Sequence, residues 1–137
     1  MKYLLMLLTV LSLALPAATL ADDKVYKQYG PYKIFYSAFN STFIDPDIAV
    51  ANQIIRGKDK GLVNIAVVLE SGTGVASVIS GSVFNIFQMS QPLKFVEVRE
   101  QNAVYYLAPF DFENEDFLTI KISVRPDAEK PAYELKF

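Results

Sequence analysis

The chain contains no cysteine and no histidine among its 137 residues. The absence of cysteine excludes disulfide bonds, which small exported domains often use for stability, and it excludes a thiolate nucleophile. The absence of histidine makes a Ser-His-Asp triad impossible, and the two absences together remove the usual ligands of zinc and copper. No serine has a lysine three residues later, as the Ser-x-x-Lys motif requires. We therefore predict a protein that is not an enzyme and uses no cofactor.

Charge is also sparse and nearly balanced. The 13 basic and 15 acidic residues give a formal net charge of −2 at pH 7. This balance gives no electrostatic basis for binding nucleic acid or an anionic membrane surface. Residues 71–77, SGTGVAS, only half match a phosphate-binding glycine loop, because a third glycine is missing and no helix follows. We predict a flexible hairpin connection there.

The first 21 residues have the pattern of a cleavable secretory signal peptide. Lys2 precedes the apolar run YLLMLLTVLSLAL, and small residues follow up to Ala21. The apolar run is shorter than the roughly 20 residues that a permanent membrane helix needs. We therefore predict cleavage after Ala21, export to the periplasm without stable membrane insertion, and a single domain spanning residues 22–137. Lys2 is the only charged residue of the signal segment, so the remaining 116 residues would carry a net charge of −3.

The rest of the chain has the pattern of an all-β protein. The full chain contains 10 Phe and 8 Tyr, and turn residues interrupt the later segments about every ten positions. Several segments alternate between apolar and polar residues, as strands with one buried face do. We predict an immunoglobulin-like antiparallel β-sandwich with strands in residues 32–39, 62–69, 75–81, 93–100, 103–110, 117–124 and 132–137.

One short helix is predicted within this β pattern, around residues 46–56. Asp45 is suited to be its N-cap, and Pro46 is suited to the first helical position. Apolar residues follow at helical spacing until Gly57: Ile44, Ile48, Ala51 and Ile55. We expect the helix to pack over one end of the sandwich.

The clearest hairpin lies in residues 93–110 and turns at residues 101–102. The register that this turn imposes pairs Glu97 with Tyr106 and places Arg99 beside them. The alternate residues of both strands form the predicted core face. Glu97, Arg99 and Tyr106 would then form an exposed group on the opposite face.

The segment YSAFNSTFI, residues 36–44, places hydroxyl and amide side chains between aromatic and aliphatic neighbours. Such polar groups can cap the end of a strand and the start of a helix through local hydrogen bonds. We favour this capping interpretation; the alternative is that the same groups, beside the aromatic rings, contact a ligand or partner. Both interpretations remain open, and the candidate interaction surface comprises Tyr36, Phe39, Asn40, Ser41, Thr42 and Phe43, together with Glu97, Arg99 and Tyr106.

Carboxylates cluster in residues 111–116, DFENED, between two predicted strands. Hard cations such as calcium accept carboxylate ligands, but this segment lacks the glycine and the twelve-residue spacing of an EF-hand. We predict a solvated turn and assign no metal ligand, and binding of a cation there stays an open question.

The segments GPYKIFYSAFNSTFIDPDIA, KGLVNIAV and FVEVREQNAVYYLAPF resemble a family of short exported proteins of Gram-negative bacteria, the domain of unknown function DUF4426. The resemblance spans residues 30–137. It implies a periplasmic β-sandwich and no established activity, so no catalytic residue follows from it. Where the family often has glycine in the hairpin turn, this chain has Gln101, which is less suited to a positive φ. Chains of the family tend to continue past the position of Phe137, so we expect a shortened last strand.

The function expected from these observations is a binding module that recruits an unknown protein or peptide partner in the periplasm through a strand edge or end loops. One alternative is a carrier of a small apolar ligand between the sheets, which requires a cavity of about 300 Å³ or more. A second alternative is a hydrolase, which requires Ser and Lys, or two carboxylates, to converge in one cleft.

Overall fold

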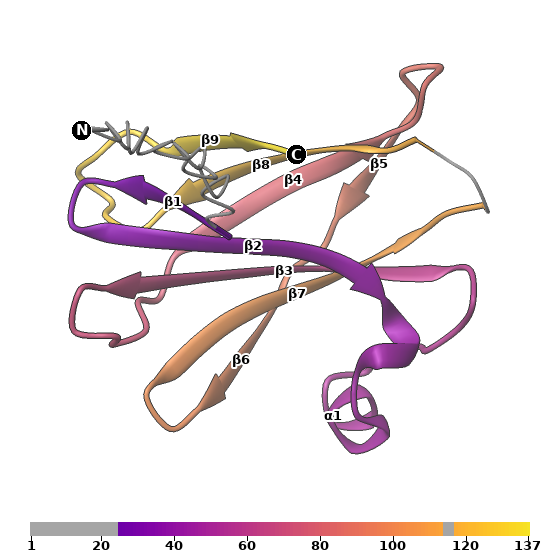
Figure 1. Cartoon of the computed structure of the whole chain (residues 1–137), viewed down its shortest axis with the longest axis horizontal. Coiled ribbons are helices and arrows are strands. Elements are labelled where there is room, and N and C mark those ends of the chain that lie inside the picture. Colours follow the sequence, from indigo (N-terminus) through magenta and orange to yellow (C-terminus); the bar gives the residue numbers. More distant parts are fainter. Residues whose placement is uncertain (1–24, 114–116) are drawn as a thin grey trace, which may run out of the picture.

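The computed structural model describes residues 25–113 and 117–137, which form two antiparallel sheets packed face to face (Figure 1). This arrangement confirms the predicted antiparallel β-sandwich. The predicted signal peptide and residues 114–116 of the acidic segment lie outside the described residues. The first sheet has the order β1 (Tyr26–Tyr29), β2 (Tyr32–Asn40), β3 (Lys60–Leu69), β7 (Ala103–Asp111) and β6 (Val96–Glu100). The second has the order β5 (Ser90–Leu93), β4 (Val78–Phe84), β8 (Thr119–Arg125) and β9 (Tyr133–Lys136).

The main core fills the space between the two sheets. Directly paired residues share a face of a sheet, so the pairing of Ile34 with Val67 places both side chains inside. Each fully buried aliphatic side chain stabilises the fold by about 1.5–3 kcal/mol. The largest side chains of this core that are at most 1% exposed are Ile34, Val63, Ile65, Val67, Val83, Ile122 and Val124.

A smaller core lies on the outer face of the first sheet. The chain leaves β2 through the 3₁₀ helix η1 (Ser41–Phe43) and the helix α1 (Pro46–Ala51), which lies over one end of this face (Figure 1). Ala49 and Ile54 pack there against Leu62, Val98 and Leu107. Among the described residues no helix is long and apolar enough to cross a membrane.

Helix α1 is shorter than the predicted span of residues 46–56. Asp45 is the N-cap, as predicted, and its carboxylate accepts a hydrogen bond from the backbone N–H of Asp47. The helix ends early because Gln53 adopts φ 57°, and the backbone N–H of Ile54 then donates to the carbonyl of Ala49 at 2.8 Å. The predicted apolar stripe is therefore wrong at its end, and Ile55 is 74% exposed.

The β6–β7 hairpin has the predicted register, including the pairing of Glu97 with Tyr106. The prediction that Tyr106 is exposed is wrong, because its other neighbour in the sheet is Ile65 of the main core and Tyr106 is only 6% exposed. Both faces of β7 are buried, since the second sheet covers one, and Ala49 of α1 and Ile54 cover part of the other. Gln101 adopts φ 53° in the turn, despite its side chain.

Three segments differ from the sequence prediction. The strand predicted at residues 93–100 is divided between β5 and β6, which belong to different sheets. The strand predicted at residues 75–81 begins later, at Val78. The turn after β3 closes locally, with the N–H of Leu69 donating to the carbonyl of Thr73 at 3.0 Å. The chain then crosses to the other sheet, so β3 and β4 do not form the predicted hairpin.

Candidate functional site

Three connections, β2–β3, β4–β5 and β7–β8, meet at one end of the sandwich (Figure 1). We call this region the loop end and define it by the described residues 41–59, 85–89, 112–113 and 117–118. Exposed apolar side chains that gather on a surface commonly mark a site of interaction. Seven of the ten exposed large apolar residues in the described chain belong to the loop end: Phe43, Val50, Ile55, Ile86, Phe87, Met89 and Phe117.

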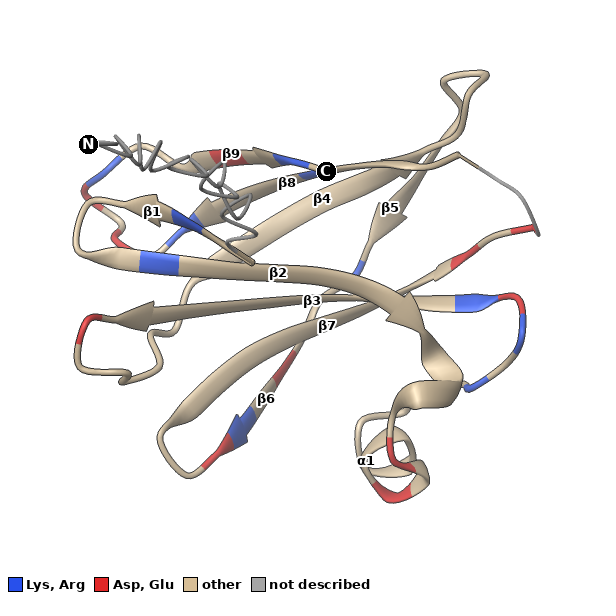
Figure 2. Ribbon diagram, viewed as in Figure 1, with Lys and Arg blue, Asp and Glu red and all other residues tan. Residues whose placement is uncertain are grey.

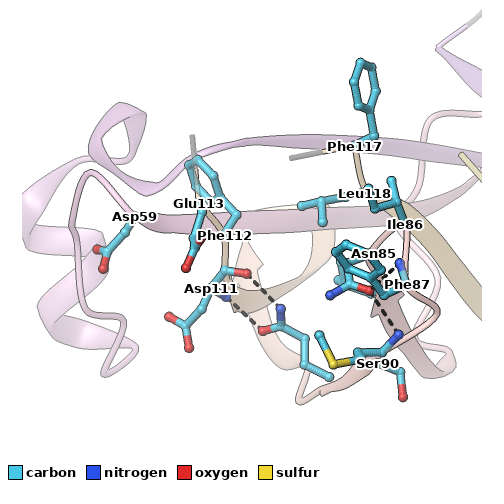
Figure 3. A pocket seen from close by; sticks show the side chains of 13 residues that line it. Asp59, Asn85, Ile86, Phe87, Ser90, Asp111, Phe112, Glu113, Phe117 and Leu118 are labelled. Carbon is cyan, nitrogen blue, oxygen red and sulfur yellow. Dashed lines mark hydrogen bonds between the residues drawn. The ribbon is translucent and has the colours of Figure 1, made fainter. Parts of the chain in front are cut away.

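A hollow of about 560 Å³ opens at the loop end, beside the β4–β5 connection (Figure 3). Its outer apolar side chains are between 64% and 82% exposed, namely Ile86, Phe87, Met89 and Phe117. Its deeper apolar wall consists of Val83, Phe112 and Leu118, which belong to the main core or pack against it. Its polar lining consists of Asp59, Asn85, Ser90, Gln91, Asp111 and Glu113.

The side-chain amide of Asn85 fixes the β4–β5 connection. Its Oδ1 accepts hydrogen bonds from the backbone N–H groups of Phe87 and Met89, both at 3.0 Å. The backbone N–H of Asn85 donates to the carbonyl of Met89, also at 3.0 Å, and Gln88 adopts φ 62°. These hydrogen bonds within residues 85–89 fix the conformation of the loop. The side chains of Ile86, Phe87 and Met89 remain exposed.

A reciprocal pair of hydrogen bonds joins the two sheets in the wall of this hollow. The Nε2 of Gln91 on β5 donates to the carbonyl of Asp111 on β7 at 2.7 Å, and the N–H of Asp111 donates to the Oε1 of Gln91 at 2.8 Å. The pairing of β6 with β7 stops at Leu107, so this stretch of β7 has no ladder partner on that side. The amide of Gln91 therefore takes the place of a neighbouring strand.

A second hollow of about 330 Å³ shares Gln91 and Asp111 with the first but is lined by Lys60 and Lys94. The Nζ of Lys60 lies 2.5 Å from the Oδ1 of Asp111, and this hydrogen bond, with the attraction of the carboxylate, raises the pKa of Lys60 above its ordinary value of 10.5. Figure 2 shows the basic start of β3 beside the acidic end of β7. The charged lining of the first hollow is therefore acidic, whereas that of the second contains both signs.

Asn40 and Ser41 of the predicted surface have structural roles as caps. The Oδ1 of Asn40 accepts from the N–H of Thr42 at 2.9 Å, and its Nδ2 donates to the carbonyl of Lys58 at 3.0 Å. The buried hydroxyl of Ser41 donates to the carbonyl of Gly57 at 3.1 Å and accepts from its N–H at 2.9 Å. These bonds support the capping interpretation, because they attach the end of β2 and η1 to Gly57 and Lys58, which follow α1 in the chain.

The aromatic residues of the same segment do not form one surface. Tyr36 packs against Phe137, with ring centroids 4.7 Å apart, whereas Phe39 packs against the smaller core. Phe43 is 81% exposed but does not line any of the hollows described here. The side chain of Thr42 is exposed as well, and its carbonyl accepts a hydrogen bond from the Nη2 of Arg56.

The second predicted surface is brought together only in part. Glu97 and Arg99 are exposed and form an ion pair, with the Nε of Arg99 2.6 Å from the Oε1 of Glu97. Tyr106 is buried, and its hydroxyl accepts a hydrogen bond from the N–H of Ser77 at 2.8 Å. Glu97, Tyr106 and Arg125 line a shallow hollow of about 290 Å³, in which Tyr106 forms part of the wall.

The hollows described here do not bring Ser and Lys together, but the three carboxylates of Asp59, Asp111 and Glu113 line the 560 Å³ hollow. In residues 25–113 and 117–137 no group of three or more Asp, Glu, His or Cys side chains could hold a metal ion. Within the same ranges the 560 Å³ hollow has Ser90 but no lysine, and the 330 Å³ hollow has two lysines but no serine. Cation binding by the acidic segment concerns residues 114–116 as well, which lie outside the described residues.

Sequence reasoning missed the β4–β5 connection, residues 85–89, as a candidate site. Its signal was the sequence NIFQM, in which three large apolar residues follow an asparagine in a segment without a predicted strand. Asparagine favours tight local turns, so the neighbouring apolar side chains could have been expected to point outwards.

Residues 26–137 match the model of a protein family described as a domain of unknown function, DUF4426. A crystal structure of a DUF4426 family protein from Pseudomonas aeruginosa PAO1 is similar to this chain, with a TM-score of 0.74 and 29% sequence identity. The similarity covers 82% of this chain and 89% of that chain. Among curated proteins, none matches the chain.

Proposed function

The chain belongs to the DUF4426 family, as its resemblance predicted, and because this family has no described function we propose one from the loop end. We propose a non-catalytic binding module that acts in the periplasm after removal of residues 1–21. Its partner docks in the 560 Å³ hollow, against the apolar side chains of the β4–β5 connection and Phe117.

One observation carries this proposal: Ile86, Phe87, Met89 and Phe117 are exposed around one hollow. Burial of each such side chain would stabilise the protein by about 1.5–3 kcal/mol, so their exposure does not serve the stability of the isolated chain. A partner that covers them gains this free energy on binding. Methionine and phenylalanine are also common in binding surfaces, because methionine adapts its shape and phenylalanine buries a large area.

Site-specific photo-crosslinking tests the proposal. A photoreactive residue is placed at position 87 in the full chain expressed in Gram-negative cells, and the control carries it at position 43. Phe43 is a suitable control because it is exposed to a similar degree as Phe87 but lies outside the hollow. We expect a discrete adduct from position 87 that position 43 does not give. Equal adducts from both positions, or none from position 87, would contradict the proposal.

The carrier of a small apolar ligand is the second candidate function. The hollow of about 560 Å³ lies within the range of about 300–1,000 Å³ that small-molecule sites occupy. It lies at the loop end, however, and not between the sheets, where a carrier was expected. Titration with the apolar fluorophore N-phenyl-1-naphthylamine separates the two functions. If the wild-type protein enhances the fluorescence of this fluorophore and Phe87→Ser abolishes the enhancement, the carrier function is supported. If the wild-type protein gives no enhancement, the binding module is supported.

A further inference from the structure

We infer that the hollow of about 290 Å³ binds a ligand that carries a carboxylate beside a short apolar group, and that Arg125 and the hydroxyl of Tyr106 hold the carboxylate. This site is separate from the docking site proposed above, because none of its lining residues belongs to the loop end. Val78 of β4 pairs with Arg125 of β8 at the end of the second sheet that lies away from the β4–β5 connection (Figure 1).

The hydroxyl of Tyr106 has a proton to donate. Tyr106 is only 6% exposed, yet it lines the hollow. Its oxygen accepts a hydrogen bond from the backbone N–H of Ser77 at 2.8 Å, and the hydroxyl of Ser77 donates to the carbonyl of Val75 at 3.2 Å. A phenol both donates and accepts, and no group in residues 25–113 and 117–137 accepts the proton of Tyr106. An oxygen atom of a ligand in the hollow would accept it.

The guanidinium of Arg125 supplies the charge. Arg125 is exposed, and its side chain forms no ion pair within the part of the chain that the structure describes. The carboxylate of Glu97 also lines the hollow, but it is compensated by Arg99, whose Nε lies 2.6 Å from its Oε1. The carboxylate of Asp127 lies outside the lining and accepts a hydrogen bond from the N–H of Glu129. The lining therefore has one positive charge without a bonded counterion.

A carboxylate suits these two donors better than other anions do. It has two oxygens, one for the guanidinium and one for the phenol, and bonds of this charged kind are the stronger ones. Its single negative charge equals the positive charge of Arg125, whereas a phosphate dianion would place a second charge near Glu97.

The rest of the lining indicates what accompanies the carboxylate. Apart from Ser77, the remaining residues are apolar, and Val78 is 71% exposed: Ala76, Val78, Pro126 and Ala128. The volume lies just below the range of about 300–1,000 Å³ that small-molecule sites occupy, so the hollow takes a small group. A short aliphatic side chain next to the carboxylate would cover Val78. Such a group occurs in a free acid and at the carboxyl end of a peptide.

NMR titration of the ¹⁵N-labelled protein obtained from the full chain tests the inference. N-acetyl-valine carries the carboxylate and a short apolar side chain, N-acetyl-valinamide lacks the charge, and inorganic phosphate lacks the apolar group. We expect N-acetyl-valine alone to give saturable shifts of the backbone amides of residues 76–78 and 127–128. The amide proton of Ser77 should move downfield, because a phenol that donates to an anion becomes a stronger acceptor.

A peptide of three glycines followed by valine, acetylated at its amino end, identifies the source of the carboxylate. It presents the same group at the end of a chain. Binding of this peptide that is tighter than binding of N-acetyl-valine identifies a polypeptide end, and equal binding identifies a free acid.

Matched variants separate the contributions of the lining residues. Arg125→Gln should weaken binding of N-acetyl-valine by about ten-fold or more, as expected for the loss of a hydrogen bond between charged groups. Tyr106→Phe keeps the ring and should also weaken binding. Glu97→Gln removes a negative charge from the wall and should strengthen binding by about two- to five-fold. The control Lys27→Gln removes an exposed cation outside the hollow and should not change the affinity. Amide spectra of the free variants show whether each remains folded, and exposed Arg125 tests the site even if Tyr106→Phe is destabilised.

The result that would overturn the inference is equal binding of N-acetyl-valine and N-acetyl-valinamide, or an unchanged affinity in Arg125→Gln. Phosphate that binds as tightly as N-acetyl-valine, or the absence of saturable shifts around the hollow with any carboxylate probe, would overturn it as well. Each of these results leaves the loop end as a docking site. Conversely, a missing crosslink from position 87 overturns the proposed function and leaves the carboxylate site intact.

Discussion

Replacement of Ser41 by alanine is expected to destabilise the protein by about 2 kcal/mol. Ser41 is fully buried, and its hydroxyl bonds to both the N–H and the carbonyl of Gly57. Alanine removes both bonds, but the carbonyl of Gly57 keeps a bond from the N–H of Lys60 at 3.2 Å. The N–H of Gly57 loses its acceptor, the Ser41 hydroxyl, which costs about 1–3 kcal/mol, and the second lost bond adds about 0.5–1.5 kcal/mol at most.

Urea denaturation followed by far-UV circular dichroism measures this effect, since the chain has no tryptophan for fluorescence. With a slope of about 1–3 kcal/mol per molar urea, a loss of about 2 kcal/mol should lower the midpoint by about 0.7–2 M. Thr42→Ala is the matched control, because the Thr42 side chain is exposed and should change stability by less than about 0.5 kcal/mol. Asn40→Ala removes a cap and should cost about 1 kcal/mol. Equal midpoints for Ser41→Ala and Thr42→Ala would refute the capping argument.

Substitutions at three further positions test other parts of the structure. Gly74→Ala should cost about 1–3 kcal/mol in thermal denaturation, because a Cβ atom would lie 2.6 Å from the backbone nitrogen of Val104. Gln91→Ala should cost about 1–3 kcal/mol in urea, and Gln91→Glu should not restore stability, because a carboxylate cannot donate to the carbonyl of Asp111. Burial and a hydrogen bond with a neighbouring glutamate raise the pKa of Tyr105 above its ordinary value of 10.0. The folded state then holds this proton more tightly, so stability falls as the pH rises above 10.0, and Tyr105→Phe should make that fall shallower in urea titrations across this range.

The sheets could be predicted from the sequence where the strands are long and the turns are short. The register of β6 and β7 followed from a two-residue loop, because such a loop fixes which residues face each other. The burial of Tyr106 could not be predicted in the same way. It depends on Ile65, which lies on a strand distant in sequence. The opposite face of β7 is buried too, because Ala49 and Ile54 pack against Leu107.

The short elements could not be predicted because tertiary contacts determine them. β5 has the sequence SQPL, which has little strand character, and its position depends on pairing with β4 and on the amide of Gln91. The early end of α1 depends on the left-handed conformation of Gln53, a residue type that seldom adopts it. The hollow lies between such elements, so its carboxylates and apolar residues come together only in three dimensions.

Polar side chains fix the connections at the loop end, in addition to the buried apolar contacts of Ala49 and Ile54. Ser41, Asn85 and Gln91 each make two hydrogen bonds to backbone groups, and each pair of bonds fixes one connection or one edge of the sandwich. Loops fixed in this way do not need their own apolar side chains for stability, so Phe87 and its neighbours are available for other contacts. The same reasoning separates stability from binding: changes at Ser41 should affect unfolding, and changes at Phe87 should affect only the partner. A loss of stability in Phe87→Ser comparable to that in Ser41→Ala would show that the exposed apolar residues serve the fold after all.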